Sequence, residues 1–165
     1  MSTMSRRTIE MAGLALAGLV LGAGFGQALA APVNRSGVIS KFDGVDEIVN
    51  ACKPSPTTNF GTVPQMSKTF TISGAASSVV VTFSGSASLN GVDSDTGFIR
   101  LQIDGVQQSP GEVPFIGVGE SNESNSFTWQ TKSLAVGSHT ARVQWRTDLG
   151  SNFCFDARSL IVLHR

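Results

Sequence analysis

From about residue 66 to the end of the chain, hydrophobic and polar residues alternate in short runs. A repeat of two places successive side chains on opposite faces of a β-strand. Gly, Ser, Asn or Asp residues bound the runs, as turns require. We therefore predict strands with one face in a core and one in water. The hydrophobic members of the runs are Phe70 and Ile72; Val79, Val81 and Phe83; Ile99, Leu101 and Ile103; Phe127 and Trp129; and Ala141, Val143 and Trp145.

The last run has a different pattern. Phe153, Phe155 and Ala157 alternate with polar residues or Cys154, whereas residues 160–163 are hydrophobic at every position. The change near Arg158 and Ser159 predicts a β-bulge, followed by a strand that is covered on both faces.

Short strands separated by turns every 8–12 residues or so favour an all-β fold, an antiparallel two-sheet sandwich of jelly-roll type, over helical or alternating βαβ folds. We expect this β-sandwich core to span 66–165. Pro54, Pro56 and Pro64 predict an irregular connection before it. The segment 31–65 should therefore be mostly irregular but tied to the domain, with at most a short helical turn within 40–52.

The first thirty residues have the layout of a signal peptide. Arg6 and Arg7 precede an uncharged hydrophobic stretch over 11–25, and Ala28 and Ala30 are the small residues that a signal peptidase recognises. A retained membrane anchor is the alternative, although the stretch is short for a membrane span. The paired arginines also resemble a twin-arginine export signal, while general secretion fits equally well. We expect cleavage near Ala30 and a secreted, periplasmic or cell-surface protein with no membrane span in its mature form.

Composition narrows the range of partners. The chain has 12 basic and 12 acidic residues, and charged residues make up only 15% of it. Basic side chains are not concentrated in any segment, so nucleic acid is not an expected partner.

Cys52 and Cys154 are the two cysteines of the chain. In an oxidising compartment two cysteines of a small domain usually pair, and we predict a disulfide between them. An intermolecular bond or free thiols are the alternatives. A metal site would need more ligands than His139 and His164 offer at their spacing.

The C-terminal third resembles a known class of domain. Residues 134–145 (LAVGSHTARVQW) combine a small-residue turn with an alternating strand, and residues 158–163 (RSLIVL) fit a closing strand. This pattern resembles bacterial carbohydrate-binding jelly rolls, and also jelly rolls of the C1q and tumour-necrosis-factor shape. The resemblance implies a β-sandwich that binds polysaccharide or a cell-surface component, or that assembles as a homo-oligomer.

Two acidic loops could hold a hard cation. Asp93 and Asp95 are two residues apart in a polar loop, and Glu120 and Glu123 flank a second one. Calcium prefers several such oxygen ligands, so a calcium site is one reading of Asp93, Asp95 and Glu120. No complete calcium-loop motif is present, and ordinary solvated turns are the better reading. We expect no other cofactor.

Trp129 and Trp145 could form a platform for stacking sugars, but they share the phase of Phe127 and Val143, which favours core packing. Arg142 and Arg146 lie on the polar phase of one strand and could bind an anionic glycan, or pair with carboxylates of a neighbouring strand. His139 begins the same strand, where a structural bond to nearby backbone is expected.

Catalytic motifs are not evident. The chain has no Gly-x-Ser-x-Gly sequence and no phosphate-binding glycine loop. We therefore expect an exported non-catalytic protein that acts by binding or assembly. The alternatives are a stand-alone carbohydrate-binding module and a small secreted hydrolase.

Overall fold

The structure is a computed structural model that describes residues 41–52, 58–119 and 122–165. The expected signal peptide, with Arg6, Arg7, Ala28 and Ala30, lies outside these residues, as does Glu120. In the described ranges no helix is long and apolar enough to cross a membrane.

The described residues form nine strands, which are arranged in two antiparallel sheets. The strands are β1 (Lys41–Glu47), β2 (Ala51–Cys52), β3 (Gly61–Ile72), β4 (Val80–Asn90), β5 (Thr96–Ile103), β6 (Val106–Gly117), β7 (Glu123–Gln130), β8 (Gly137–Thr147) and β9 (Asn152–His164).

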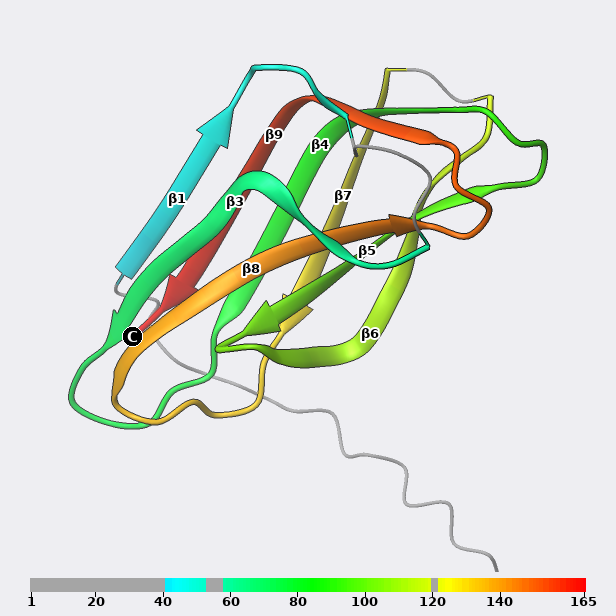
Figure 1. The fold of residues 1–165 in the computed structure, drawn as a ribbon. Coiled ribbons are helices and arrows are strands. Elements are labelled where there is room, and N and C mark those ends of the chain that lie inside the picture. The colour runs from blue at the N-terminus through cyan, green and yellow to red at the C-terminus, as the bar shows by residue number, and fades with distance from the viewer. Residues whose placement is uncertain (1–40, 53–57, 120–121) are drawn as a thin grey trace, which may run out of the picture. The chain divides into compact units, whose positions relative to one another are not determined.

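The two sheets have the strand order of a jelly roll. One sheet, here called sheet A, runs β1-β9-β4-β7, with β2 paired to β9. The other, sheet B, runs β3-β8-β5-β6 and packs against sheet A (Figure 1). Strands pair from the middle of the chain outward, β5 with β6, β4 with β7, β3 with β8 and β1 with β9, as in a folded long hairpin. The predicted all-β jelly-roll sandwich is confirmed.

Most of the core consists of the hydrophobic residues of the predicted runs. It also includes residues that those runs did not contain, among them Val63, Met66, Val113, Phe115 and Ile116. Phe83, Leu101 and Val143 are fully buried between the sheets, and Phe127 packs at the margin. Aromatic rings form the centre of this core, where the ring centroids of Trp145 and Phe155 are 5.3 Å apart. The alternation therefore identified most of the buried side chains on both sheets.

A β-bulge in β9 confirms the predicted change of pattern. Gly85 of β4 lies opposite Arg158, whereas Ala87 lies opposite Phe155, so β9 contains one more residue than β4 over this stretch. After the bulge Leu160 and Val162 are buried, while Ile161 and Leu163 on the outer face are only partly covered. The expected full cover on both faces is thus achieved on one face only.

The N-terminal part contains more strand than we predicted. Residues 41–47 and 51–52 pair with β9, and β3 begins at Gly61, so the expectation of irregular chain or a helical turn was wrong for these residues. The sequence KFDGVDE of β1 has no clear alternation. This agrees with its place at the edge of sheet A, where it pairs with β9 and none of its residues is fully buried. Its position is supported by the His164 ring, which bonds to the Asp43 carboxylate at 2.9 Å.

Candidate ligand-binding face

The outer face of sheet B gathers arginines, glutamines and two phenylalanines. Here it is called the arginine face, and it is formed by Phe60, Phe98, Arg100, Gln107, Glu112, Arg142, Gln144 and Arg146. Cross-strand pairing aligns these residues in rows, because Phe98 lies opposite Arg146 and Arg100 lies opposite Gln144. The alternate residues of the same strands, such as Ile99 and Trp145, point into the core. Successive residues of these strands point to opposite faces of sheet B, so the alternation that places Ile99 and Trp145 in the core also places their neighbours on the arginine face.

Two guanidinium groups and two phenyl rings form a stack on this face. The Arg100 guanidinium carbon lies 3.8 Å from the centroid of the Phe60 ring. The Arg146 guanidinium carbon lies 5.5 Å from the Phe60 centroid and 4.6 Å from that of Phe98. These distances lie within the range of cation–π contacts, about 6 Å from the ring centroid. Phe60 and Phe98 both remain partly exposed.

Arg146 is held in place by carboxylates. Its Nε and Nη2 donate to the two oxygens of Glu112 at 2.9 and 2.8 Å, and its Nη1 donates to Asp148. These hydrogen bonds raise the pKa of Arg146 and lower the pKa of Glu112. Arg146 therefore pairs with carboxylates, as predicted, but Glu112 is on β6, beyond the neighbouring strand β5, and Asp148 directly follows β8.

Arg100 and Arg142 have different surroundings. Arg100 donates from Nε to Gln144 Oε1 and from Nη1 to Gln107 Oε1, both at 2.8 Å. Burial lowers the pKa of Arg100. Arg142 is exposed, and within the described part of the chain it has no hydrogen-bond or ion-pair partner. It lies opposite Gln102 of β5 and Ser67 of β3.

The tryptophans do not form a sugar-stacking platform. Trp129 is 0% exposed and Trp145 is 1% exposed, because both belong to the core phase of their strands. The core-packing interpretation is confirmed, and the binding role suggested for these two residues was wrong. The aromatic rings that do reach the outer face of sheet B are those of Phe60 and Phe98.

Asp95 has a structural role, because both of its carboxylate oxygens accept hydrogen bonds from backbone N–H groups. Its side chain is buried at the end of the sandwich, where Oδ1 accepts hydrogen bonds from the backbone N–H of Thr96, Asp148 and Leu149, and Oδ2 accepts one from Ser151. Burial opposes ionisation, but these donors outweigh it and lower the pKa of Asp95.

The suggested calcium site therefore loses its central ligand. Asp93 is exposed in the turn before β5, and Glu120 lies outside the described residues. Among the residues that the structure describes, no group of three His, Cys, Asp or Glu side chains is close enough to hold a metal ion.

His139 and the cysteines are arranged as the sequence predicted. The His139 ring bonds through Nε2 to the Ala135 carbonyl at 2.9 Å and through Nδ1 to Asp104 at 2.6 Å. Both ring nitrogens are thus occupied by structural contacts. Cys52 and Cys154 form a disulfide between directly opposed residues of β2 and β9.

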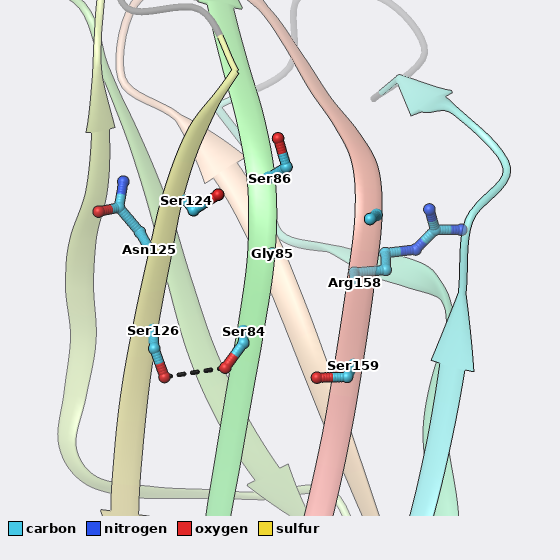
Figure 2. A pocket seen from close by; sticks show the side chains of 9 residues that line it. Ser84, Gly85, Ser86, Ser124, Asn125, Ser126, Arg158 and Ser159 are labelled. Atoms are coloured by element: carbon cyan, nitrogen blue, oxygen red, sulfur yellow. Dashed lines mark hydrogen bonds between the residues drawn. The ribbon is translucent and has the colours of Figure 1, made fainter.

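A shallow depression of about 350 Å³ lies on the outer face of sheet A (Figure 2). Figure 2 shows serines of β4, β7 and β9 around it, with Ser84 donating to Ser126 at 2.9 Å. The Arg158 side chain extends away from the serines and donates to the backbone carbonyls of Pro64 and Val49. The depression follows from small side chains beside the bulge, and its hydroxyl groups partly satisfy one another. We assign it no ligand.

No protein-family model and no curated protein sequence matches this chain. Solved structures with a similar fold include dimeric latent PorU from Porphyromonas gingivalis, with a TM-score of 0.49 and 10% identity over 76% of this chain. This chain spans only 12% of the length of PorU.

Two further similar structures are modules of comparable size. The EclA C-terminal domain, a sugar-binding protein, has a TM-score of 0.40 and 17% identity, covering 81% of this chain and 88% of that one. The CBM36-1 domain of a multidomain xylanase from the hindgut metagenome of Trinervitermes trinervoides has a TM-score of 0.40 and 13% identity, covering 73% and 96%. Carbohydrate-binding proteins are thus among the similar chains, as the sequence resemblance implied.

Proposed function

We propose that this chain is a non-catalytic binding protein that acts outside the cytoplasm, and that its arginine face binds carbohydrate. The observation that carries the proposal is the stack of Phe98, Arg146, Phe60 and Arg100, with amide groups beside it. The exposed parts of the Phe60 and Phe98 rings offer apolar surface to the C–H groups of a sugar ring. Guanidinium and amide groups offer the donors and acceptors that sugar hydroxyls need.

The rigidity of the stack supports a binding role. Arg146 is held by two bonds to Glu112, and Arg100 by bonds to Gln144 and Gln107. Side chains that are already ordered lose little conformational entropy when a ligand binds. A pre-organised, partly exposed aromatic and polar surface is typical of a recognition site.

The extracellular setting is supported by the disulfide between Cys52 and Cys154, because such bonds persist in oxidising compartments. The expected signal peptide over 1–30 belongs to the same proposal. A non-catalytic role is supported by His139, whose two ring nitrogens are engaged by Asp104 and Ala135 and are not available as a general base.

The test is affinity electrophoresis of the purified protein in gels that contain soluble polysaccharides, followed by titration calorimetry with any that retard it. Phe98→Ala should weaken binding about tenfold, since aromatic anchors commonly contribute more than 1 kcal/mol. Phe42→Ala is the matched control, because Phe42 is 66% exposed on the other sheet. Equal affinity of the two variants, or no binding to any polysaccharide, would contradict the proposal.

A further inference from the structure

In the described part of the chain, two of the three arginines of the arginine face are not hydrogen-bonded to a carboxylate. Arg100, Arg142 and Arg146 contribute positive charge, and the carboxylates beside them among the described residues are Glu112, Asp148 and Asp104. Glu112 and Asp148 are bonded to Arg146, and Asp104 is bonded to His139. The outward positions of β3 that border the face, such as Thr62 and Ser67, are uncharged. Among the described residues, Arg100 and Arg142 therefore make no hydrogen bond to a carboxylate.

Within the described ranges, Arg142 is the arginine of this face with no carboxylate bonded to it or opposite it. Arg100 lies opposite Glu112, although it donates hydrogen bonds to the neutral oxygens of Gln144 and Gln107. Arg142 is exposed and has no partner within the described residues. A guanidinium group without a carboxylate is the usual recognition element for an oxyanion, because its donors match two oxygens at once.

Resting on the proposed function, we infer that the arginine face binds an anionic polysaccharide, and that Arg142 contacts a carboxylate or sulfate group of it. The pairing of Arg100 with Gln144 and of Arg142 with Gln102 makes the two arginines diagonal neighbours on β5 and β8. Diagonal residues on adjacent strands are about 7–8 Å apart. One extended ligand can therefore contact both groups.

The spacing along β8 indicates a polymer as the ligand. Arg142 precedes Arg146 by four residues, which corresponds to about 13 Å along a strand. A sugar ring stacked beside Phe98 and an anionic group bound to Arg142 must then belong to different units of one chain. The face is suited to a polysaccharide that carries regularly placed charges.

The experiment compares matched polymers by titration calorimetry at low and moderate salt. Polygalacturonate is compared with its fully methyl-esterified form, which has the same backbone without the charge. Dextran sulfate is compared with dextran, and duplex DNA serves as an unrelated polyanion. We expect a charged polysaccharide to bind at least about tenfold more tightly than its neutral counterpart, and the two pairs distinguish carboxylate from sulfate.

Variants locate the contact. Arg142→Glu should weaken binding to the charged polymer at least about tenfold, and Arg142→Gln should weaken it less, because Gln keeps hydrogen-bonding capacity. Lys132→Glu makes the same charge change at an exposed position after β7, outside the arginine face. It should leave the affinity unchanged. Thermal unfolding of each variant shows that the fold is intact.

The outcomes separate this inference from the proposed function. Equal binding of the charged and neutral polymers, or equal effects of Arg142→Glu and Lys132→Glu, would overturn the inference while carbohydrate binding through Phe98 stands. Equally tight binding of duplex DNA would overturn it as well, because the face would then recognise any polyanion. Binding to none of the polysaccharides would overturn the proposed function itself.

Discussion

Asp95 connects two turns that are more than fifty residues apart in sequence. Asp95 lies at the end of the β4–β5 turn. Its carboxylate accepts hydrogen bonds from backbone N–H groups of the β8–β9 turn, including those of Asp148 at 2.9 Å and Ser151 at 2.8 Å. An ionised carboxylate suits this position, since each oxygen can accept several bonds. Asp95, a possible cation ligand by its sequence pattern, therefore organises one end of the sandwich.

We predict that Asp95→Asn destabilises the domain by about 2 kcal/mol. The amide has only one acceptor oxygen, so it cannot accept all of the hydrogen bonds from these backbone N–H groups. The lowered pKa of Asp95 adds a pH dependence. Its contribution is present above the unfolded value of about 3.9 and is lost as the pH falls through the lower folded pKa. Urea denaturation between pH 3 and pH 7 or so measures both effects. Asp93→Asn, at an exposed position two residues earlier, should change stability little.

His139 should give the opposite pH dependence. The bond to Asp104, followed by the bond to Ala135, raises the pKa of His139, because both ring nitrogens face acceptors and the doubly protonated ring satisfies both. Its contribution is complete below about pH 6.5 and is lost as the pH rises through the folded pKa. Since Asp104 is 47% exposed, we expect a contribution of only about 0.5–1 kcal/mol. Urea denaturation at several pH values should show this loss in the parent and not in His139→Gln; identical pH profiles would contradict it.

At the scale of strands, residues without side chains allow close packing between elements. Gly97 faces inward on β5, and a Cβ placed there would lie 2.7 Å from Ile116 Cγ2 and 2.8 Å from Phe153 Cε1. Both distances are shorter than a van der Waals contact. Gly97 therefore lets β6 and β9 approach the end of β5.

Gly97→Ala should destabilise the domain by about 1–3 kcal/mol, because the neighbours must shift to admit the methyl group. Thermal or urea unfolding measures the change. Gly61→Ala is the control, since a Cβ at Gly61 would make only an ordinary contact of 3.7 Å with Trp145. Similar stability of the two variants would mean that the core around Gly97 relaxes easily.

Alternation along the strands predicted which side chains are buried, but it did not predict β1 or the arginine stack. Phe98 is two residues from Arg100 on β5, so both side chains lie on the same face of the strand. The outward direction of Phe98 could therefore have been predicted from the sequence. Phe60 precedes β3 and carries no such signal. Its contact with Arg100 depends on the path of the chain before β3 and on the pairing of β3, β8 and β5.

At the scale of the whole molecule, the disulfide joins residues 102 positions apart and so encloses most of the sandwich. Cross-linking of distant residues stabilises a fold mainly by restricting the unfolded chain. We predict that reduction lowers the stability by about 2–5 kcal/mol while the sandwich core stays the same. Thermal unfolding with and without reductant measures this loss. The double variant Cys52→Ser, Cys154→Ser should already have the lower stability and should not respond to reductant.

The sequence by itself determined the all-β class, the buried face of most strands, the bulge in β9 and the pairing of the two cysteines. The fold class, the buried faces and the bulge follow from the alternation of hydrophobic and polar residues within each strand. The cysteine pairing follows from there being only two cysteines in the chain. The tertiary structure decided which polar groups meet. Arg158 reaches a carbonyl 109 residues away, and Arg146 reaches Glu112 across the intervening strand β5. Such contacts depend on the register between distant segments, and the alternation within one strand carries no information about that register.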